Sequence, residues 1–265
     1  MKPKLSVIIV AYNSSQHIKN MLLSIEKQTK TAHEIIIVDN NSLDQTIAQI
    51  YASKVKVSLL KQKENLGFSK ANNLGVKNSI GEYLMFLNPD TFLMNSALDQ
   101  LTGFIEDNKD VGLVAPQLID DSGNPQLSVR KFPSIVGAIK EYYFCIRNSY
   151  EPYAHEGDDP VEVDSIVGAA MLIPKSVYLN AGGFNDKYFM YYEDIELCKK
   201  INQLGYKIMY LPYVKVKHSV GASAKTNPKS ASYLKQAAYL YHGGLSYYLL
   251  QLLLRLRRSS PFFRD

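Results

Sequence analysis

The first half of the chain alternates continuous apolar runs with segments of helical periodicity. The apolar runs predict strands at 5–11, 34–39, 55–60 and 83–88. The segments between them predict helices at about 15–28, 44–52 and 69–79, the first of which we expect Ser14 and Ser15 to cap. Strands that are apolar throughout and alternate with helices are typical of a parallel sheet covered on both faces. We therefore expect an α/β fold with a mostly parallel central sheet flanked by helices.

The second half of the chain has a less regular pattern. It predicts strands at 111–119, 166–173 and 207–216, and a helix at 193–204 that ends before Gly205. Residues 126–159 are rich in Pro, Tyr and charge, and we interpret them as a long excursion near the functional site. After residue 222 the composition becomes that of a helical tail. We expect a main domain at 1–222 and a basic amphipathic tail at 223–265.

Positive charge is concentrated in the tail. The formal net charge of the chain is +5, and seven Lys and Arg with one Asp after residue 222 give +6, leaving −1 for residues 1–222. A nearly neutral main domain disfavours a general nucleic-acid binder, whereas a basic tail suits an anionic surface such as phospholipid. Cys145 and Cys198 lack the spacing of a zinc site, and no apolar run reaches 18 residues. With no signal-peptide pattern either, we expect a cytoplasmic protein, peripheral on the inner face of the cell membrane.

Polar residues follow three of the predicted strands. In parallel α/β sheets, ligands lie at the carboxyl ends of the strands, which directs attention to 11–13, 39–41 and 88–90. An acid after the second strand, here Asp39, commonly hydrogen-bonds a nucleoside. The first turn contains no glycine, so a dinucleotide cofactor is disfavoured. Ordinary turn chemistry is the alternative for Asp39 and Asn41.

Two further positions favour a divalent cation. Asp90 follows an apolar strand, where a carboxylate can hold a cation that bridges two phosphate oxygens. His218 follows the last predicted strand, which can return beside Asp90, and an imidazole tilts the preference from Mg²⁺ toward Mn²⁺. A simple Asn-Pro-Asp turn and a structural histidine are the alternatives.

Glu193 and Asp194 open a predicted helix. A carboxylate there can take the proton from an attacking hydroxyl. The alternative is helix capping, since acids near a helix N-terminus stabilise its free N–H groups and its dipole.

The motifs resemble a known family when they are taken in order. They are VIIVAYN, IIIVDNNS, ENLGFSKANNLG, YLMFLNPD, IVGAAMLI, GGFNDKYFMYYEDIELC and HSVGAS. The series resembles family 2 glycosyltransferases with the GT-A fold, and closely resembles the bacterial rhamnosyltransferase branch. The resemblance covers about residues 4–223, the main domain, and leaves the tail outside.

The resemblance implies a metal-dependent, inverting transfer from a nucleotide-diphospho-sugar. It implies nucleoside contacts from Ala11, Tyr12, Asn13, Asp39 and Asn41, and a donor pocket lined by Asn65, Gly67, Phe68 and Asn72. It implies Mn²⁺ or Mg²⁺ on Asp90 and His218, and Asp194 as the base with Glu193 beside it. Many members have an acid where this chain has Asn88, so Asn88 is expected to bind ribose or a metal-bound water; Asn-Pro-Asp is itself usual in the rhamnosyl branch. Arg130, Lys131, Gly168 and Ala169 are candidates for contacts with the acceptor or a diphosphate, a solvated pair being the alternative for the two cations.

The expected reaction is transfer of L-rhamnose from dTDP-L-rhamnose to a polyprenyl-diphosphate-linked saccharide in cell-surface polysaccharide synthesis. UDP-galactofuranose, UDP-GlcNAc and UDP-glucose are the alternative donors. A non-catalytic carbohydrate-binding or scaffold protein is the alternative outside enzymes, and a nucleotidyltransferase is disfavoured because the first turn is not Gly-rich.

The tail has its own pattern. Residues 245–256 are apolar and aromatic and are followed by Arg257 and Arg258, which is typical of a helix lying in a membrane interface. A helix packed on the domain, or a dimer contact, is the alternative.

Overall fold

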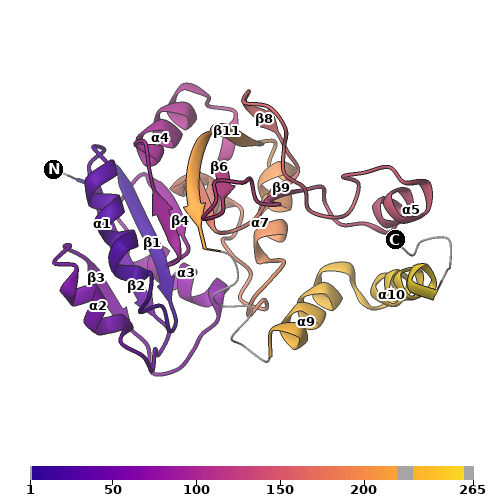
Figure 1. Ribbon diagram of the computed structural model, residues 1–265, viewed down its shortest axis with the longest axis horizontal. Coiled ribbons are helices and arrows are strands. Elements are labelled where there is room, and N and C mark those ends of the chain that lie inside the picture. Colours follow the sequence, from indigo (N-terminus) through magenta and orange to yellow (C-terminus); the bar gives the residue numbers. More distant parts are fainter. Residues whose placement is uncertain (1, 220–228, 260–265) are drawn as a thin grey trace.

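A nine-stranded mixed sheet forms the centre of the protein (Figure 1). The computed structural model describes residues 2–219 and 229–259, except for the side chains of 257–259. The strands lie in the order β3-β2-β1-β4-β10-β6-β11-β5, with β8 paired to β11. Their bounds are β1 Leu5–Ala11, β2 His33–Asp39, β3 Ser58–Lys61, β4 Tyr83–Leu87, β5 Thr91–Leu93, β6 Val111–Ile119, β8 Val161–Glu162, β10 Ala170–Pro174 and β11 Lys207–His218. A separate antiparallel pair joins β7 (Val129–Arg130) to β9 (Ser165–Ile166).

The sheet is mostly parallel, as the hydrophobic pattern predicts. Strand β1 pairs in parallel with β2 and β4, β2 with β3, and β6 with β11. Strands β10 and β5 run antiparallel to their neighbours. The register sets Ala11 opposite Asp39, so the polar turns after β1 and β2 lie side by side.

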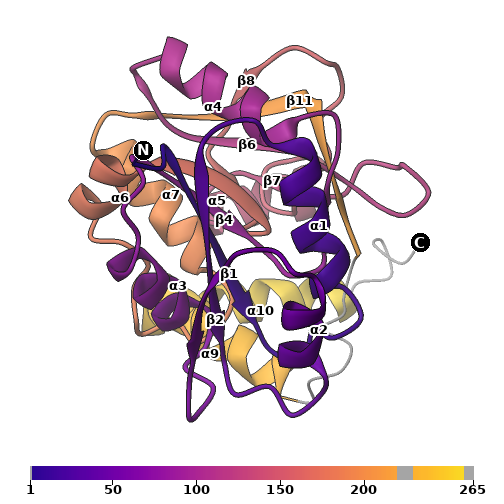
Figure 2. The ribbon, with the colours of Figure 1, turned by 90° about the vertical axis from the view of Figure 1, so that its left-hand side faces the viewer.

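Helices cover both faces of the sheet (Figure 2). The described helices are α1 Ile18–Gln28, α2 Thr46–Ala52, α3 Phe68–Lys77, α4 Ala97–Asp107, α5 Ile135–Phe144, α6 Lys175–Asn180, α7 Glu193–Gln203, α9 Ser230–His242 and α10 Gly244–Ser259. Successive residues of β1 enter two cores: Val7 and Ile9 pack with α1 and α4, and Ile8 packs with α3, α6 and α7. Since side chains alternate along a strand, burial of both faces explains why β1 is apolar throughout.

Two sequence predictions about local structure were wrong. Helix α1 begins at Ile18, and neither Ser14 nor Ser15 caps it; the Ser14 carbonyl accepts the N–H groups of His17 and Ile18. The strand predicted at 166–173 is interrupted at 167–169, where the chain leaves β9 and turns into β10. The excursion predicted at 126–159 contains β7 and α5. The interruption at 167–169 exposes backbone groups that the site uses.

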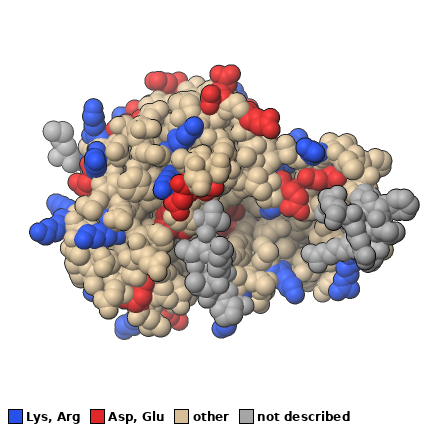
Figure 3. Space-filling view, viewed as in Figure 1, with Lys and Arg blue, Asp and Glu red and all other residues tan. Residues whose placement is uncertain are grey.

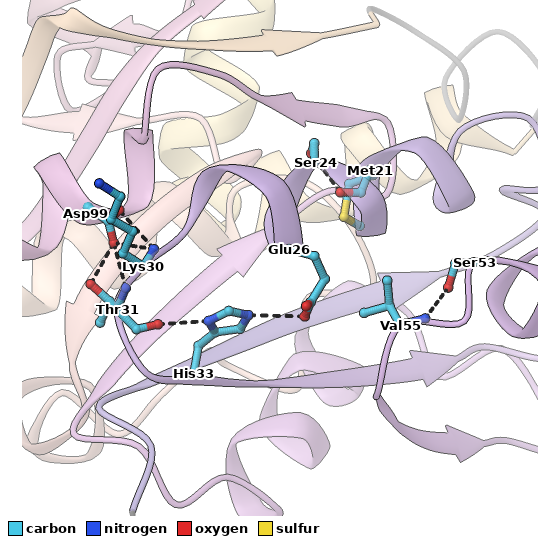
Figure 4. Close-up of polar contacts among 9 residues, drawn as sticks. All are labelled: Met21, Ser24, Glu26, Lys30, Thr31, His33, Ser53, Val55 and Asp99. Atoms are coloured by element: carbon cyan, nitrogen blue, oxygen red, sulfur yellow. Dashed lines mark hydrogen bonds and ion pairs between the residues drawn. The ribbon is translucent and has the colours of Figure 1, made fainter.

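Asp99 of α4 fixes the end of the sheet opposite the strand C-termini (Figure 4). Its carboxylate accepts the N–H groups of Lys30 and Thr31 and the Thr31 hydroxyl, just before β2 begins. Burial alone would raise the pKa of Asp99, but these hydrogen bonds outweigh it and lower the pKa. His33 continues the network, with one ring nitrogen near the Thr31 carbonyl and the other 3.5 Å from Glu26.

The two tail helices pack on the main domain (Figure 1). Leu250 of α10 packs with Ala138 and Tyr142 of α5, and Ala237 of α9 packs with Tyr192 and Ile195 at the start of α7. No helix among residues 2–219 and 229–259 is long and apolar enough to cross a membrane. The predicted boundary at 222 and 223 lies outside the described residues, so the division at that point stays a prediction.

Candidate active site

The carboxyl ends of β1 and β2 form one half of the site. Asn13 has a left-handed backbone (φ 50°), its N–H donates to the Ser42 hydroxyl, and its side-chain oxygen accepts the N–H of Leu43. Asn13 thereby joins the two turns. Tyr12 and Asn41 lie exposed beside it, and Asn41 is also left-handed (φ 64°).

Asp39 has an unused oxygen in this half of the site. The side chain is buried, one oxygen accepts the Ser42 N–H, and the other has no partner among the described residues. An unpaired buried acceptor costs about 1–3 kcal/mol, so the arrangement favours a ligand that donates to it. A nucleoside is such a ligand, as predicted for Ala11, Tyr12 and Asp39; the role stays a prediction.

The donor-pocket residues form a tight turn joined to the loop before α7. Asn65 accepts the N–H of Gly67, and the N–H of Phe68 donates to the carbonyl of Phe189. Gly67 is left-handed (φ 80°), and a Cβ there would lie 2.6 Å from the Phe189 carbonyl oxygen, so this close approach requires glycine. Asn72 is buried, and its side-chain amide donates to the Phe68 carbonyl. That nitrogen therefore stabilises the first turn of α3.

Asn40 lies in the strand-end segment 39–41 that the sequence singled out, but it had been given no role of its own. It is buried, donates its amide to the Gly67 carbonyl, and has an unpartnered buried oxygen. It therefore joins the turn after β2 to the donor-pocket turn. Its place between two named candidates, Asp39 and Asn41, was the available signal.

Asp90 and His218 meet, as their predicted positions require. Pairing of β5 with β11 brings Thr91 opposite His218, and the Ser219 N–H donates to the Asp90 carbonyl. One Asp90 carboxylate oxygen then lies 3.4 Å from His218 Nε2, and both side chains are about nine-tenths buried, with exposures of 10% and 13%. No group of three or more His, Cys, Asp or Glu suited to a metal ion occurs among the described residues. The protein offers two ligands here, and substrate oxygens or water would supply the others.

Gln126, a residue that the sequence analysis missed, fixes the tautomer of His218. Its amide nitrogen donates to the His218 carbonyl, so its oxygen must face the ring, 2.9 Å from Nδ1. An amide oxygen only accepts, so Nδ1 carries a proton and Nε2 is the ring nitrogen that faces Asp90. An imidazole nitrogen oriented in this way, next to a carboxylate, fits Mn²⁺ or Mg²⁺.

Asp194 is held between α7 and the turn at 167–169. One carboxylate oxygen accepts the N–H of Gly168 at 2.9 Å, and the other accepts the N–H of Ile195 at 2.8 Å. Burial raises the pKa of Asp194, while these hydrogen bonds and the positive charge of Arg130 oppose the rise. Tyr192 occupies the N-cap position, and because the Ile195 N–H belongs to the first turn of α7, Asp194 also stabilises the start of this helix.

Glu193 differs from its neighbour. Burial, and after it the charge of Asp194, raises the pKa of Glu193 well above its ordinary value, and one carboxyl oxygen has no partner among the described residues. Two N–H groups from Gly168 and Ile195 stabilise the charge of Asp194, whereas a backbone hydrogen bond opposes the rise only weakly for Glu193. Of the two acids, Asp194 is therefore the better suited to carry the negative charge.

The turn at 167–169 connects the two halves of the site. The Gly168 N–H holds Asp194, and the Ala169 carbonyl accepts the backbone N–H of Asn88 at 2.9 Å. Gly168 and Ala169 act here through their backbone. Any contact of these residues, or of the Asn88 side chain, with substrate stays a prediction.

Arg130 and Lys131 are neighbours in the chain, but their side chains have different surroundings. Arg130 pairs with Ser165 and lies near enough to Asp194 to affect its pKa, and its Nε is buried without a partner in the described residues. Lys131 is exposed. The structure therefore distinguishes a half-buried cation near Asp194 from an exposed one.

Comparison with known proteins agrees with this geometry. A model of glycosyl transferase family 2 matches residues 6–165, more than half of the chain. The chain belongs to glycosyl transferase family 2. It is a glycosyltransferase of the rhamnosyltransferase type, as the ordered motifs predict.

Three relatives carry that assignment. The chain is 26% identical to an N-acetylglucosaminyl-diphospho-decaprenol L-rhamnosyltransferase of Mycobacterium tuberculosis, over 87% of this chain and 80% of the relative. It is 28% identical to rhamnosyltransferase WbbL of Escherichia coli, over 78% of this chain and 80% of the relative. It is 24% identical to dTDP-rhamnosyl transferase RfbF of Shigella flexneri, over 83% of this chain and 71% of the relative.

Two solved structures share the fold. GalNAc-T7 with UDP, GalNAc and Mn²⁺ has a TM-score of 0.66 at 15% identity, covering 97% of this chain and 55% of its own. Mannosyltransferase PcManGT from Pyrobaculum calidifontis with GDP-Man and Mn²⁺ has a TM-score of 0.59 at 17% identity, covering 98% of this chain and 76% of its own. The predicted GT-A fold is confirmed.

Replacing Asp194 by Asn tests the base. We expect kcat to fall about 10²–10⁴-fold with donor binding retained, because the amide cannot accept the hydroxyl proton. Glu193→Gln is the matched control and should cost far less, because burial raises the pKa of Glu193 well above its ordinary value and disfavours its charged form. The raised pKa of Asp194 also places the acid limb of kcat/KM above that of an ordinary Asp, with activity lost as pH falls through it. Equal losses in the two variants would contradict this assignment.

Replacing His218 by Ala tests the metal pair. The Mn²⁺ concentration for half-maximal activity should rise at least about tenfold, and Gln126→Ala should raise it about 10–100-fold by releasing the imidazole tautomer. Metal titration of purified variants measures both effects. Asp121→Asn, an exposed acid paired with Lys217, is the control. An unchanged metal requirement in His218→Ala would remove His218 from the metal site.

Proposed function

We propose that this glycosyltransferase transfers L-rhamnose from dTDP-L-rhamnose to a saccharide carried on a polyprenyl diphosphate. The observation that carries the proposal is that one turn, at 167–169, bonds both to the Asp194 carboxylate and to the strand end that leads to the Asp90–His218 pair. The relatives support the sugar and the acceptor, since one is named for a decaprenyl-diphosphate-linked acceptor and another for dTDP-rhamnose.

Asp90 and His218 would hold the divalent cation. When bound, Mn²⁺ or Mg²⁺ would neutralise the charge that develops on the departing nucleoside diphosphate. The residues present fit this ion because Gln126 orients His218 Nε2 toward the Asp90 carboxylate. The imidazole favours Mn²⁺ over Mg²⁺.

Asp194 supplies the base for a single displacement. It removes the proton of the acceptor hydroxyl while the hydroxyl oxygen forms a bond to the anomeric carbon. The bond from that carbon to the diphosphate oxygen breaks on the opposite side, and the nucleoside diphosphate leaves. One displacement inverts the configuration and needs no enzyme nucleophile.

The turns after β1 and β2 orient the donor. The free Asp39 oxygen would accept a hydrogen bond from the nucleoside. Exposed Tyr12, in the neighbouring turn, would contact the nucleobase. Asn41 lies at the exposed rim, and the Asn65–Phe68 turn would line the sugar side. Asn88 follows β4 next to Asp90, where its amide suits ribose or a metal-bound water better than direct metal ligation.

A panel of nucleotide sugars tests the donor. We expect dTDP-L-rhamnose with Mn²⁺ to raise Tm more than UDP-galactofuranose, UDP-GlcNAc or UDP-glucose, because a ligand stabilises the fold by about 2.7 kcal/mol at 100 times its Kd. The same donor should support transfer to a polyprenyl-diphosphate-linked GlcNAc. A better UDP-sugar would change the donor, and no turnover with any donor would leave the carbohydrate-binding or scaffold alternative.

The tail would hold the protein peripherally on the inner face of the cell membrane. Five exposed apolar residues recur along α10 at helical spacing: Leu245, Tyr248, Leu249, Leu252 and Leu256. Phe144 and Ile146, at and just after the end of α5, are also exposed, and α10 packs on α5.

Helices α9 and α10 contain Lys and Arg but no Asp or Glu. Figure 3 shows basic side chains along the edge where these helices lie, in contrast to the acidic group near the centre. Such a surface suits an anionic bilayer interface.

Sedimentation with vesicles tests this surface. We expect wild-type protein to bind phosphatidylglycerol vesicles, and the double variant Leu249→Glu with Leu252→Glu to bind at least about tenfold more weakly, since it places charge in the apolar stripe. Leu43→Glu, at an exposed leucine in the turn between β2 and α2, is the matched control. Equal vesicle binding by the control and the double variant would assign the stripe to another contact.

A further inference from the structure

The end of α9 borders the catalytic base. The ring of Tyr192, two residues before Asp194, lies 5.2 Å from the Tyr241 ring and 6.0 Å from the His242 ring. Farther back along the loop, the ring of Phe189 lies 4.4 Å from that of Tyr233. Helix α9 therefore packs beside the candidate active site, while α10, which follows it, carries the apolar stripe described above.

Two buried nitrogens in this region have no partner. They are Nε of Arg130 and Nε2 of His242, and neither forms a hydrogen bond within residues 2–219 and 229–259. Leaving a buried polar nitrogen unpaired is costly. Arg130 Nε always donates, and His242 Nε2 donates when it carries a proton, so together the two atoms suit a ligand that accepts hydrogen bonds.

The surroundings of His242 are cationic. Lys199 of α7 lies over the Tyr241 ring at 5.5 Å, and Arg130 approaches from β7. Burial, followed by the charges of Lys199 and Arg130, lowers the pKa of His242. An anion bound here would gain from Arg130 and Lys199 and would favour protonation of His242.

The segment from Gln126 to Arg130 links the metal pair to these two nitrogens. Gln126 holds His218 at one end, the Ser128 carbonyl accepts the Val167 N–H in the middle, and Arg130 lies near Asp194 at the other end. Four residues of extended chain span at most about 13–14 Å. A diphosphate on Asp90 and His218 and an anion on Arg130 and His242 would be held by different side chains, at the two ends of this segment.

We propose that Arg130 and His242 form a subsite for a phosphate of the acceptor, the group that links its first sugar to the lipid. This inference rests on the proposed function, since it requires a diphosphate-linked acceptor. The tail then contributes a specificity-determining side chain, and α9 selects acceptors by charge next to the reacting hydroxyl. The donor's diphosphate has the same chemistry and is the other source that the experiment must separate.

Kinetics with two acceptors test the subsite. One acceptor is a polyprenyl-diphosphate-linked saccharide, and the other is the same saccharide as an uncharged alkyl glycoside. In detergent, His242→Asn and Arg130→Gln should each raise KM for the diphosphate acceptor about 10–100-fold, the value of a hydrogen bond to a charged group. KM for the uncharged acceptor and for the donor should change less than about twofold, a split that general damage to the fold would not produce.

Lys235→Ala, an exposed cation on the same helix, is the matched control for charge and helix stability. Arg130→Lys should restore part of the affinity. A rise in donor KM would assign the anion to the donor, and equal rises with both acceptors would assign the residues a structural role; either result overturns the inference.

A binding measurement separates this inference from the reaction itself. With EDTA present, inorganic pyrophosphate should raise the Tm of the wild-type protein and of Asp90→Asn, but not of His242→Asn or Arg130→Gln. That result would support the subsite even if the donor or acceptor named above proved wrong. No pyrophosphate effect on the wild-type protein would overturn the subsite while leaving the proposed reaction intact.

Discussion

The hydrogen bond from the Gly168 N–H to Asp194 joins the central sheet to helix α7. Because the next residue, Ala169, bonds to Asn88, the same turn also fixes the strand end that leads to Asp90. A strand running unbroken from 166 to 173 would have used these backbone groups for sheet pairing. The interruption between β9 and β10 frees them, and the positions of Asp194 and of the strand end before Asp90 both depend on it.

The start of α7 shows how backbone strain serves the same purpose. Tyr191 and Tyr192 are left-handed, with φ of 75° and 67°, at a cost of about 1–3 kcal/mol each. Packing against Ile195 and against Ala237 of α9 offsets that cost. The reversal places Glu193 and Asp194 side by side at the start of α7, where their hydrogen bonds differ. Two adjacent acids of similar chemistry thereby acquire different surroundings.

The sequence predicted the sheet well where burial was simple. Residues 5–11 and 111–119 are strands with the expected ends, because both faces of each are buried and no polar position confuses the pattern. Asp90, His218 and Asp194 came from motifs and strand ends, and the structure brings the first two together. Gln126 was missed because its partner lies 92 residues away, and a lone Gln in a polar stretch has no local signal. His242 was missed for a similar reason, since only the packing of α9 brings it to Tyr192. The break at 167–169 was hidden because its residues are small or apolar and read as strand.

The joint between α9 and α10 has a consequence for the length of the sugar chain that the protein extends. Gly243 alone separates the two helices, and the Tyr239 ring contacts those of Tyr247 and Tyr248, which braces the joint. His242 therefore lies only three residues from Leu245, the first exposed residue of the apolar stripe, a span of at most about 10 Å. If the proposed function holds, this short separation between His242 and Leu245 keeps the acceptor-binding side chain at a fixed distance from the lipid headgroups. It brings the sugars nearest the lipid to Asp194 and passes over those at the end of a long glycan, which places the reaction early in chain growth.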